Sequence, residues 1–239
     1  MKTTLLCTLA VVATAAITQA QDLFVYDNTV NGLNQFYLNG GATLQTPNTI
    51  TRLVADDITP AAGFAGQSIT RFYFGVYNNN STAVSARPRI RFYGSDGAGG
   101  GPGTYITGYT FNPISFAANN GSTYYATVAA GTFPVPSGTF WMGMTFDNNN
   151  GGTGATATQL DNLGLLMFNP PTVGTSADTF FTTTGAGSFL VSNPAGTLQN
   201  FSGNPVANFF FGITVIPEPA TASLLLLGVA GLFISRRKA

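Results

Sequence analysis

Asp56 and Asp57 are the only adjacent carboxylates between residues 21 and 216, and carboxylates can bind metals or move protons. Ca²⁺ takes carboxylate and carbonyl oxygens, so the pair is a candidate structural calcium site. The alternative is a pair of strand-end carboxylates that a turn or an arginine satisfies. Neighbouring side chains on a strand point to opposite faces. The pair therefore cannot by itself supply the two facing carboxyl groups of a glycosidase.

A second candidate is the row Arg87, Arg89 and Arg91, in which arginine alternates with apolar residues across the segment ARPRIRFY, residues 86–93. This alternation predicts a strand with the three arginines on one face, about 6.6 Å apart. Such a row could grip an acidic polysaccharide; the alternative is a solvated outer face crossed by aspartate partners. Pro88 predicts a sheet edge or a strand start, because proline cannot donate to the ladder.

Trp141 is the only tryptophan of the chain and lies in the segment TFWMGMTF, residues 139–146. Together with the nine tyrosines it could stack on sugar rings. The alternative is packing in the core or at an interface, where large aromatic rings are most often found.

Composition excludes several classes of site. The chain has no histidine, and its single cysteine, Cys7, lies near the N-terminus. Ser-His-Asp and Cys-His triads and histidine-based zinc sites are therefore excluded from residues 21–216. This region has five arginines, eight aspartates and neither lysine nor glutamate, so its net charge is −3. Nucleic-acid binding needs a basic surface, which this balance does not provide.

The elements that would position these residues are short strands. Glycine, threonine and aromatic residues dominate residues 21–216, a composition typical of an all-β domain. Glycine, proline and asparagine turns separate the apolar segments, which predicts one β-sandwich or jelly-roll-like domain. The glycine-rich segments 94–103 and 147–154 are predicted to be loops, the first of them mobile. Strands are predicted at 23–26, 35–38, 48–58, 68–77, 86–93, 105–111, 123–128, 139–146, 163–168, 179–183, 189–191 and 208–215.

The N-terminus has the order of a secretory signal. Met1 and Lys2 precede an apolar stretch from Leu5 to Ile17, and Ala20 is a small residue suited to cleavage before Gln21. Residues 1–20 are therefore predicted to be a signal peptide, exported by the Sec translocon and removed by signal peptidase. Cys7 lies inside the apolar stretch rather than after it, so lipidation is not expected. The alternative is an uncleaved N-terminal anchor.

The C-terminus has the order of a membrane anchor. Pro217-Glu218-Pro219 precedes an uncharged apolar segment, and a basic cluster, Arg236, Arg237 and Lys238, follows it. We predict a transmembrane helix at 220–235 and a cytoplasmic tail at 236–239, which places the domain 21–216 outside the cell. The fifteen residues from Ala220 to Ile234 make a helix of about 22 Å, which is shorter than the hydrocarbon core of a bilayer. Ser235, snorkelling of the arginines or local thinning of the bilayer must complete the span. The alternative is an apolar helix buried in the domain.

This tail, 217–239, resembles the PEP-CTERM sorting signal of bacterial surface proteins that exosortase processes. The motifs Val54–Ile58 (VADDI), Ile69-Thr70 and Pro102-Gly103-Thr104 resemble the jelly-roll-like bodies of many such proteins. The resemblance implies secretion, transient insertion in the lipid bilayer, and processing near Pro217, Glu218 and Pro219 by an exosortase-type enzyme. It also implies display at the cell surface or in an extracellular matrix, often together with exopolysaccharide.

Three functional hypotheses follow from the sequence. The leading one is an exported, non-enzymatic surface or matrix protein without a cofactor, associated with exopolysaccharide or biofilm. The second is a carbohydrate-binding module of the cell envelope that uses the arginine row or Trp141. The third is a polysaccharide-active enzyme, which would need two aspartate carboxyl groups facing each other across a cleft.

Overall fold

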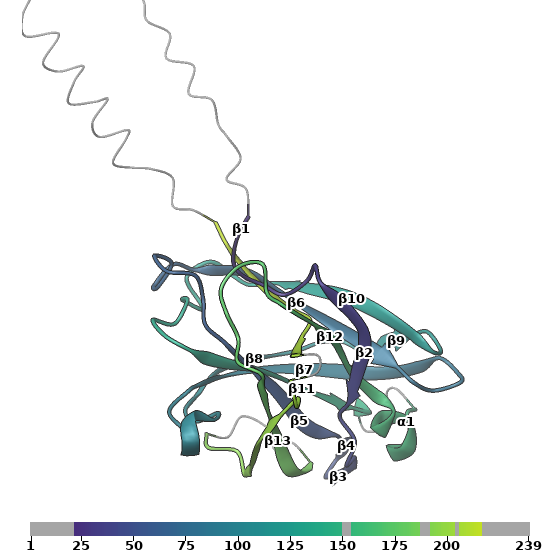
Figure 1. Cartoon of the computed structure of the whole chain (residues 1–239). Helices are drawn as coiled ribbons and strands as arrows, with labels where there is room; N and C mark the ends of the chain where they lie inside the picture. Colours follow the sequence, from purple (N-terminus) through teal and green to yellow (C-terminus); the bar gives the residue numbers. More distant parts are fainter. Residues whose placement is uncertain (1–21, 150–153, 187–191, 204–205, 217–239) are drawn as a thin grey trace, which may run out of the picture. The chain divides into compact units, whose positions relative to one another are not determined.

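Two antiparallel β-sheets face each other in the computed structural model (Figure 1), which describes residues 22–149, 154–186, 192–203 and 206–216. The predicted signal peptide, 1–20, and the predicted sorting signal, 217–239, lie outside the described residues. Almost every described element is a strand, which confirms the all-β, sandwich-like prediction. No helix within these four ranges has the length and apolar character needed to cross a bilayer.

Sheet A is built around the long strand β6 (Ile69–Asn78). Along one edge β6 pairs with β10 over eight residues, and along the other it pairs first with β16 and then with β12. The outer members β1 and β2 then pair with β16 and β12, respectively. The other strands of sheet A are β1 (Leu23–Asp27), β2 (Gly32–Leu38), β10 (Asn120–Thr127), β12 (Leu163–Phe168), β15 (Asn208–Phe209) and β16 (Phe211–Val215).

Sheet B is built around β11 (Phe140–Asp147), which lies between β5 and β7. Beyond β5 come β13 and β14, and beyond β7 come β8 and β9. The short strand β4 also meets the end of β11, where Ile50 pairs with Asp147. The strands around β11 are β3 (Thr43–Gln45), β4 (Asn48–Ile50), β5 (Arg52–Ile58), β7 (Val84–Gly94), β8 (Tyr105–Thr110), β9 (Ile114–Phe116), β13 (Thr179–Ala186) and β14 (Gly196–Asn200).

Aromatic side chains fill the space between the sheets. Phe72 of sheet A meets Phe92 of sheet B edge to face, with ring centroids 5.4 Å apart, and Phe92 in turn packs on Phe133 at 4.7 Å. All three rings are buried. The alternating patterns of segments 68–77, 86–93 and 139–146 place these apolar residues on the inner faces, as the period-2 rule requires. Residues 21–216 contain no cysteine, so no disulfide supplements the burial of these apolar side chains, which is the dominant favourable term in folding.

The edge-strand prediction from Pro88 is wrong. β7 is an interior strand, with β11 along one side and β8 and β9 along the other. Pro88 lies opposite the break between β8 and β9, so no strand residue is paired with it on that side. The N–H group that proline lacks is therefore not needed for a ladder hydrogen bond. The Pro88 carbonyl still accepts a hydrogen bond from the Phe111 N–H at 3.1 Å.

Several elements were not predicted from the sequence, among them the three-residue strands β3 and β9. The short helix α1 (Ala157–Asp161) begins with a capping box, in which Thr156 and Gln159 bond each other's backbone N–H groups. Strand β14 has only exposed or half-buried residues, so no apolar alternation marks it. The predicted strand 48–58 divides into β4 and β5 at Thr51, whose hydroxyl accepts the Phe146 N–H. The strand predicted at 189–191 lies outside the described residues.

Candidate functional site

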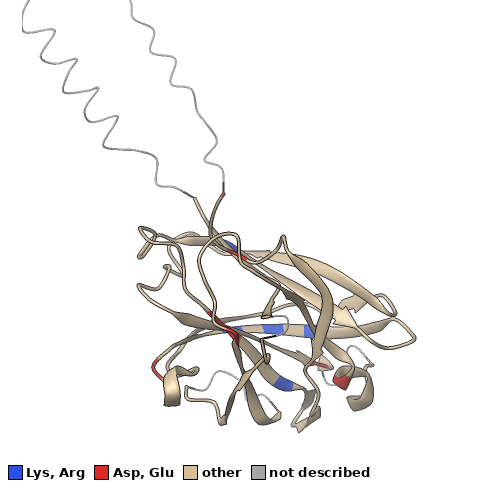
Figure 2. Ribbon diagram, in the orientation of Figure 1, with Lys and Arg blue, Asp and Glu red and all other residues tan. Residues whose placement is uncertain are grey.

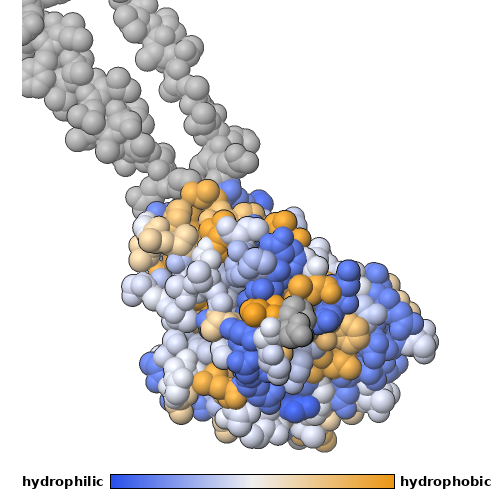
Figure 3. All heavy atoms as spheres, viewed as in Figure 1, coloured by the Kyte–Doolittle hydropathy of each residue, from blue (hydrophilic) through white to orange (hydrophobic). Residues whose placement is uncertain are grey.

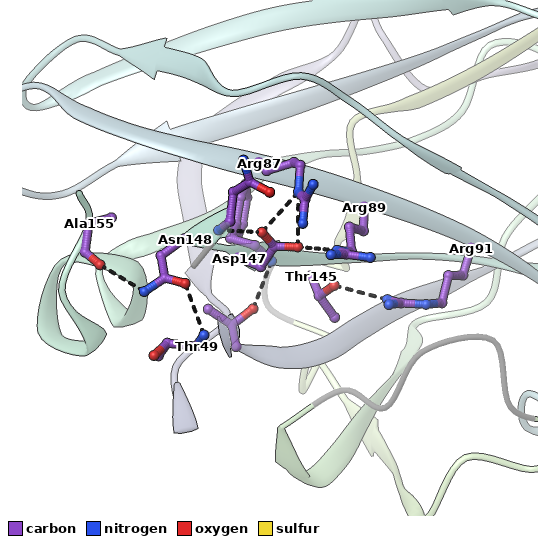
Figure 4. Close-up of polar contacts among 11 residues, drawn as sticks. Thr49, Arg87, Arg89, Arg91, Thr145, Asp147, Asn148 and Ala155 are labelled. Carbon is purple, nitrogen blue, oxygen red and sulfur yellow. Dashed lines mark hydrogen bonds and ion pairs between the residues drawn. The ribbon is translucent and has the colours of Figure 1, made fainter. Parts of the chain in front are cut away.

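The arginine row of β7 lies on the outer face of sheet B, as the alternation predicts, but its side chains have partners within the domain (Figure 4). Figure 2 shows the arginines in a line along β7. The Arg87 Nε donates to Asp147 Oδ1 at 3.0 Å, and the Arg89 Nε pairs with Asp147 Oδ2. Asp147 is fully buried, so one carboxylate lies against two guanidinium groups with little water between them.

Arg91 is the most buried of the three, with only 1% of its surface exposed. Its Nη1 donates to Thr145 Oγ1 at 2.9 Å. Burial lowers the pKa of Arg91 to about 10. Burial also lowers the pKa of Arg89, against the opposing effect of Asp147. The row thus belongs to a charge network in which Arg91 and Asp147 are buried and Arg87 and Arg89 are half-buried. An acidic polysaccharide would have to compete with Asp147 for it.

Asp147 and the following residue also fix the end of β11. Asp147 Oδ1 accepts the Asn149 N–H at 2.7 Å, which starts the turn after the strand. Asn148 then links two segments, because its Oδ1 accepts the Thr49 N–H at 2.9 Å while its Nδ2 donates to the Ala155 carbonyl. The network therefore ties β7, β11 and β4 together at one end of sheet B.

Asp56 and Asp57 lie on opposite faces of β5, as their adjacency predicts. Asp56 points between the sheets, where its Oδ2 accepts the Phe209 N–H of sheet A at 2.7 Å. Asp57 accepts the Ala177 N–H at 3.1 Å. The Ser176 hydroxyl lies 3.3 Å from an oxygen of each carboxylate, so it connects the two. The pair therefore joins β5 to sheet A and to the segment before β13.

Burial, followed by the neighbouring charge of Asp57, raises the pKa of Asp56 well above its usual range. Burial also raises the pKa of Asp57. Tyr26 is buried beside them, and burial together with the Asp56 charge raises its pKa. Within the described ranges no three acidic, cysteine or histidine side chains come together as a metal centre would need. The calcium site at Asp56 and Asp57 stays a prediction.

The raised pKa of Asp56 predicts that the domain is more stable in mild acid. The folded state keeps a proton on Asp56 at pH values where the unfolded chain, with a pKa of about 3.9, has lost it. This contribution is complete below about pH 4 and disappears as pH rises through the folded pKa, so the free energy of unfolding should fall as the pH rises above about 4. Urea denaturation of the full chain at several pH values measures this.

Asp56→Asn should flatten that slope, because asparagine is neutral and its side-chain oxygen can still accept the Phe209 N–H. Asp96→Asn is the control. Hydrogen bonds from Thr104 lower the pKa of the exposed Asp96, so its contribution has the opposite sign. The slope should therefore survive Asp96→Asn. A stability that rises as the pH rises above about 4 in the unaltered protein would contradict this assignment.

Trp141 lies on the outer face of sheet B and is only 3% exposed. Its indole Nε1 donates to the Gly100 carbonyl at 3.0 Å, and its ring meets Phe181 edge to face. The segment 94–103 covers it. This segment is a loop, as predicted, and it is bonded internally. Asp96 accepts both the N–H and the hydroxyl of Thr104, and the Gly94 N–H donates to the Thr104 carbonyl. Trp141 is therefore a packing residue under a folded loop.

Half-buried aromatic residues lie elsewhere, on the outer face of sheet A. Phe36 and Tyr77 stack in parallel with ring centroids 3.9 Å apart. Beside them is an open pocket of about 290 Å³. Its lining combines aromatic rings and side-chain amides, without a charge: Asn34, Gln35, Phe36, Tyr77, Gly121 and Leu166. In segment 68–77 the alternation places Tyr73 and Tyr77 on the face of the strand that points away from the core. This pattern is the signal in the sequence that could have identified the outer face of sheet A.

A second hollow, of about 260 Å³, lies between the loop 94–103 and the segment before β14. Phe181 and Leu198 are its largest apolar side chains, and Asn193 supplies a side-chain amide. It lies on the outer face of sheet B, close to Trp141. No carboxylate is among the residues that line either hollow, so neither has the acid–base pair of a glycosidase.

Comparison with known proteins identifies the tail of the chain. A family model for the PEP-CTERM protein-sorting motif matches residues 215–238. A search of curated proteins finds no significant match. One similar structure is the clostridial cysteine protease Cwp84 after propeptide cleavage, at 13% identity and a TM-score of 0.38, covering 77% of this chain and 40% of that one.

The other similar structure contains the cysteine protease and lectin-like domains of Cwp84, a surface layer associated protein of Clostridium difficile. It matches at 11% identity and a TM-score of 0.38, covering 74% of this chain and 36% of that one. The chain thus spans about two fifths of the length of these structures or less.

Proposed function

We propose that this chain, an exported protein whose PEP-CTERM motif directs it to exosortase, is a non-enzymatic component of the bacterial cell surface or its exopolysaccharide matrix. The observation that carries the proposal is the position of the motif. It begins at Val215, the last residue of strand β16, so the sandwich ends where the sorting signal starts. The motif thus has a folded cargo directly before it.

The finer parts of this proposal come from the sequence. A signal peptide at 1–20 brings the chain through the Sec translocon, and signal peptidase removes it. The apolar segment 220–235 then holds the chain in the membrane, with Arg236, Arg237 and Lys238 inside the cell. Exosortase cuts near Pro217-Glu218-Pro219 and passes the jelly-roll-like body to the surface. The lack of histidine and of a reactive cysteine in the body supports a binding or structural role over catalysis.

Fractionation of the producing cells tests this proposal. Three forms are compared: the full chain, a chain that ends at Ile216, and a full chain with Glu218→Ala. The full chain should be found first in the membrane and then, shortened, at the surface. The truncated chain should leave the cell without a membrane-bound stage, and Glu218→Ala should stay longer in the membrane. Recovery of all three forms in the cytosol would overturn the proposal.

The outer face of sheet A favours a second function, which is binding of a neutral glycan. The pocket beside Phe36 and Tyr77 offers ring faces for the C–H side of a sugar and the amides of Asn34 and Gln35 for its hydroxyls. This pocket takes the role that the sequence assigned to the arginine row and Trp141, whose side chains are engaged inside the domain. An uncharged lining suits a neutral sugar better than an acidic one.

A glycan array with neutral and acidic oligosaccharides tests the second function. Binding should be confined to neutral glycans and should weaken at least about tenfold with Tyr77→Ala, since an aromatic contact in a pocket is worth more than 1 kcal/mol. Tyr125→Ala is the matched control, because Tyr125 is exposed on the same sheet face but outside the pocket. Equal loss with both variants, or binding of acidic glycans only, would remove this pocket as the site.

A further inference from the structure

One end of the sandwich carries almost no charge. There β1 begins, β16 ends, and two loops protrude, residues 61–66 (AAGFAG) and 129–134 (AAGTFP). We call this surface the tip and define it as Leu23, Ile216 and these two loops. Neither loop contains a charged residue, and most of their alanines and glycines are exposed. The space-filling view shows apolar residues gathered at this end of the domain (Figure 3).

The parts of the tip are held together by the strand pairing and backbone hydrogen bonds beneath them. Leu23 pairs with Val215, and Val215 pairs with Ile69 of β6. The Ile69 N–H donates to the Phe133 carbonyl, which joins the loop 129–134, and the Ala61 N–H donates to the Val25 carbonyl, which joins the loop 61–66. The two loop regions are also joined directly, because the Gly66 N–H donates to the Val135 carbonyl at 2.9 Å and Ser68 forms an antiparallel bridge with Pro134. The tip is therefore one continuous surface.

The charges beside the tip are neutralised. Arg71 pairs with Asp22 at 2.7 Å, and the Arg71 guanidinium also lies over the ring of Tyr125. Leu23 and Ile216 are 44% and 43% exposed. Moving this surface out of water therefore exposes no unpaired charge to an apolar medium, and desolvating charge is the main cost of contact with lipid.

The position of the sorting motif indicates that the tip contacts the lipid bilayer. Only residues 217–219 separate Ile216 from the uncharged segment that starts at Ala220. Four residue steps span at most about 14 Å. The headgroup layer on each side of a bilayer is on the order of 5–7 Å thick. A tip tethered so closely meets the bilayer at a high effective concentration, so a weak apolar surface is enough for contact.

We infer that the tip is a lipid-contact surface, which rests in the headgroup layer while the segment after Pro219 is in the bilayer. This inference rests on the anchoring step of the proposed function. The contact orients the sandwich on the membrane. It also holds the residues around Pro217 at the depth of the headgroups, where a membrane-embedded processing enzyme could reach them. The outer face of sheet A, which runs away from the tip along β6, stays in water.

Environment-sensitive labels on the full chain test the inference. In a Cys7→Ser background, Ala62→Cys and Ala130→Cys place a nitrobenzoxadiazole dye in each loop of the tip. Ser81→Cys is the matched control, because it follows β6 at its far end and the ten residues of that strand span about 30 Å. The labelled chains are reconstituted in vesicles of phosphatidylethanolamine with a minor share of phosphatidylglycerol, and flotation reports membrane anchoring.

Both tip dyes should shift their emission to the blue and be quenched by doxyl-labelled lipid, whereas the Ser81 dye should do neither. Adding Ala130→Asp to the Ala62-labelled chain should remove the shift, because a carboxylate resists transfer from water. If the tip dyes behave like the Ser81 dye while the protein floats with the vesicles, the tip contact is wrong and the anchor stands. If the protein does not float, the anchor fails and the tip contact fails with it.

Discussion

Asp147→Ala should lower the free energy of unfolding by about 3–5 kcal/mol, the range seen when one partner of a buried ion pair is removed. Arg87 and Arg89 would then lie against each other on β7 without the carboxylate that both contact. The turn after β11 would also lose the acceptor of the Asn149 N–H. Chemical denaturation of the purified chain, followed by circular dichroism, measures the loss.

Asp161→Ala is a matched control for Asp147→Ala. Its carboxylate accepts one backbone N–H, from Ala42, and is partly exposed, so we expect a loss of about 1 kcal/mol. Replacing Arg87 and Arg89 with methionine in the Asp147→Ala background should recover much of the stability, because these substitutions remove the two positive charges that the missing carboxylate no longer compensates. If Asp147→Ala costs no more than Asp161→Ala, the network does not carry the stability assigned to it.

Trp141→Ala should cost about 3–5 kcal/mol, as truncations of large buried aromatic residues do. The ring packs on Phe181 and against Leu53, Ala55 and Tyr93, and its N–H holds the Gly100 carbonyl. Without the indole ring, the loop 94–103 loses the surface it packs on and the hydrogen bond to the Gly100 carbonyl. Amide hydrogen exchange in that loop should therefore become faster, along with the loss of stability.

Trp141→Phe separates the two contributions of this residue. Phenylalanine keeps an aromatic ring against Phe181 but cannot donate to Gly100, so the loss should be smaller and exchange should speed up mainly in the loop. Tyr125→Ala, on the exposed face of sheet A, is the comparison for a truncated aromatic ring without burial and should cost far less. A Trp141→Ala protein as stable as the unaltered one would show that the loop, rather than the indole, closes this face.

The sequence predicted the elements that have apolar alternation. β6, β7 and β11 each expose one side of their alternating pattern to the core, and those strands appear close to the predicted positions. β14 and α1 were missed because neither has a strong apolar period: β14 is held by pairing with β13, and α1 by its capping box. Apolar periodicity in a sequence marks elements that bury one face, and β14 and α1 bury few side chains.

The candidate site was harder to predict, for a different reason. Alternation correctly placed the β7 arginines together on one face, but it cannot show whether a face is covered. Asp147 is 56 residues from Arg91, and pairing with β11 is what brings it to the row. The stacked pair Phe36 and Tyr77 likewise joins β2 to β6 through their common neighbour β12. Such contacts depend on the register between distant strands, which no local pattern contains.

The place of β16 has a mechanical consequence for a protein held by its C-terminal end. β16 lies between β1 and β6 and is antiparallel to both. Tension applied at Ile216 along the strand direction would therefore load the hydrogen bonds on both sides of β16 together, in shear, instead of opening them one after another. Shear of several parallel bonds resists force far better than peeling does. A pull on the C-terminal end of the domain would thus be shared between β1 and β6 from the first residue of the sheet that it loads.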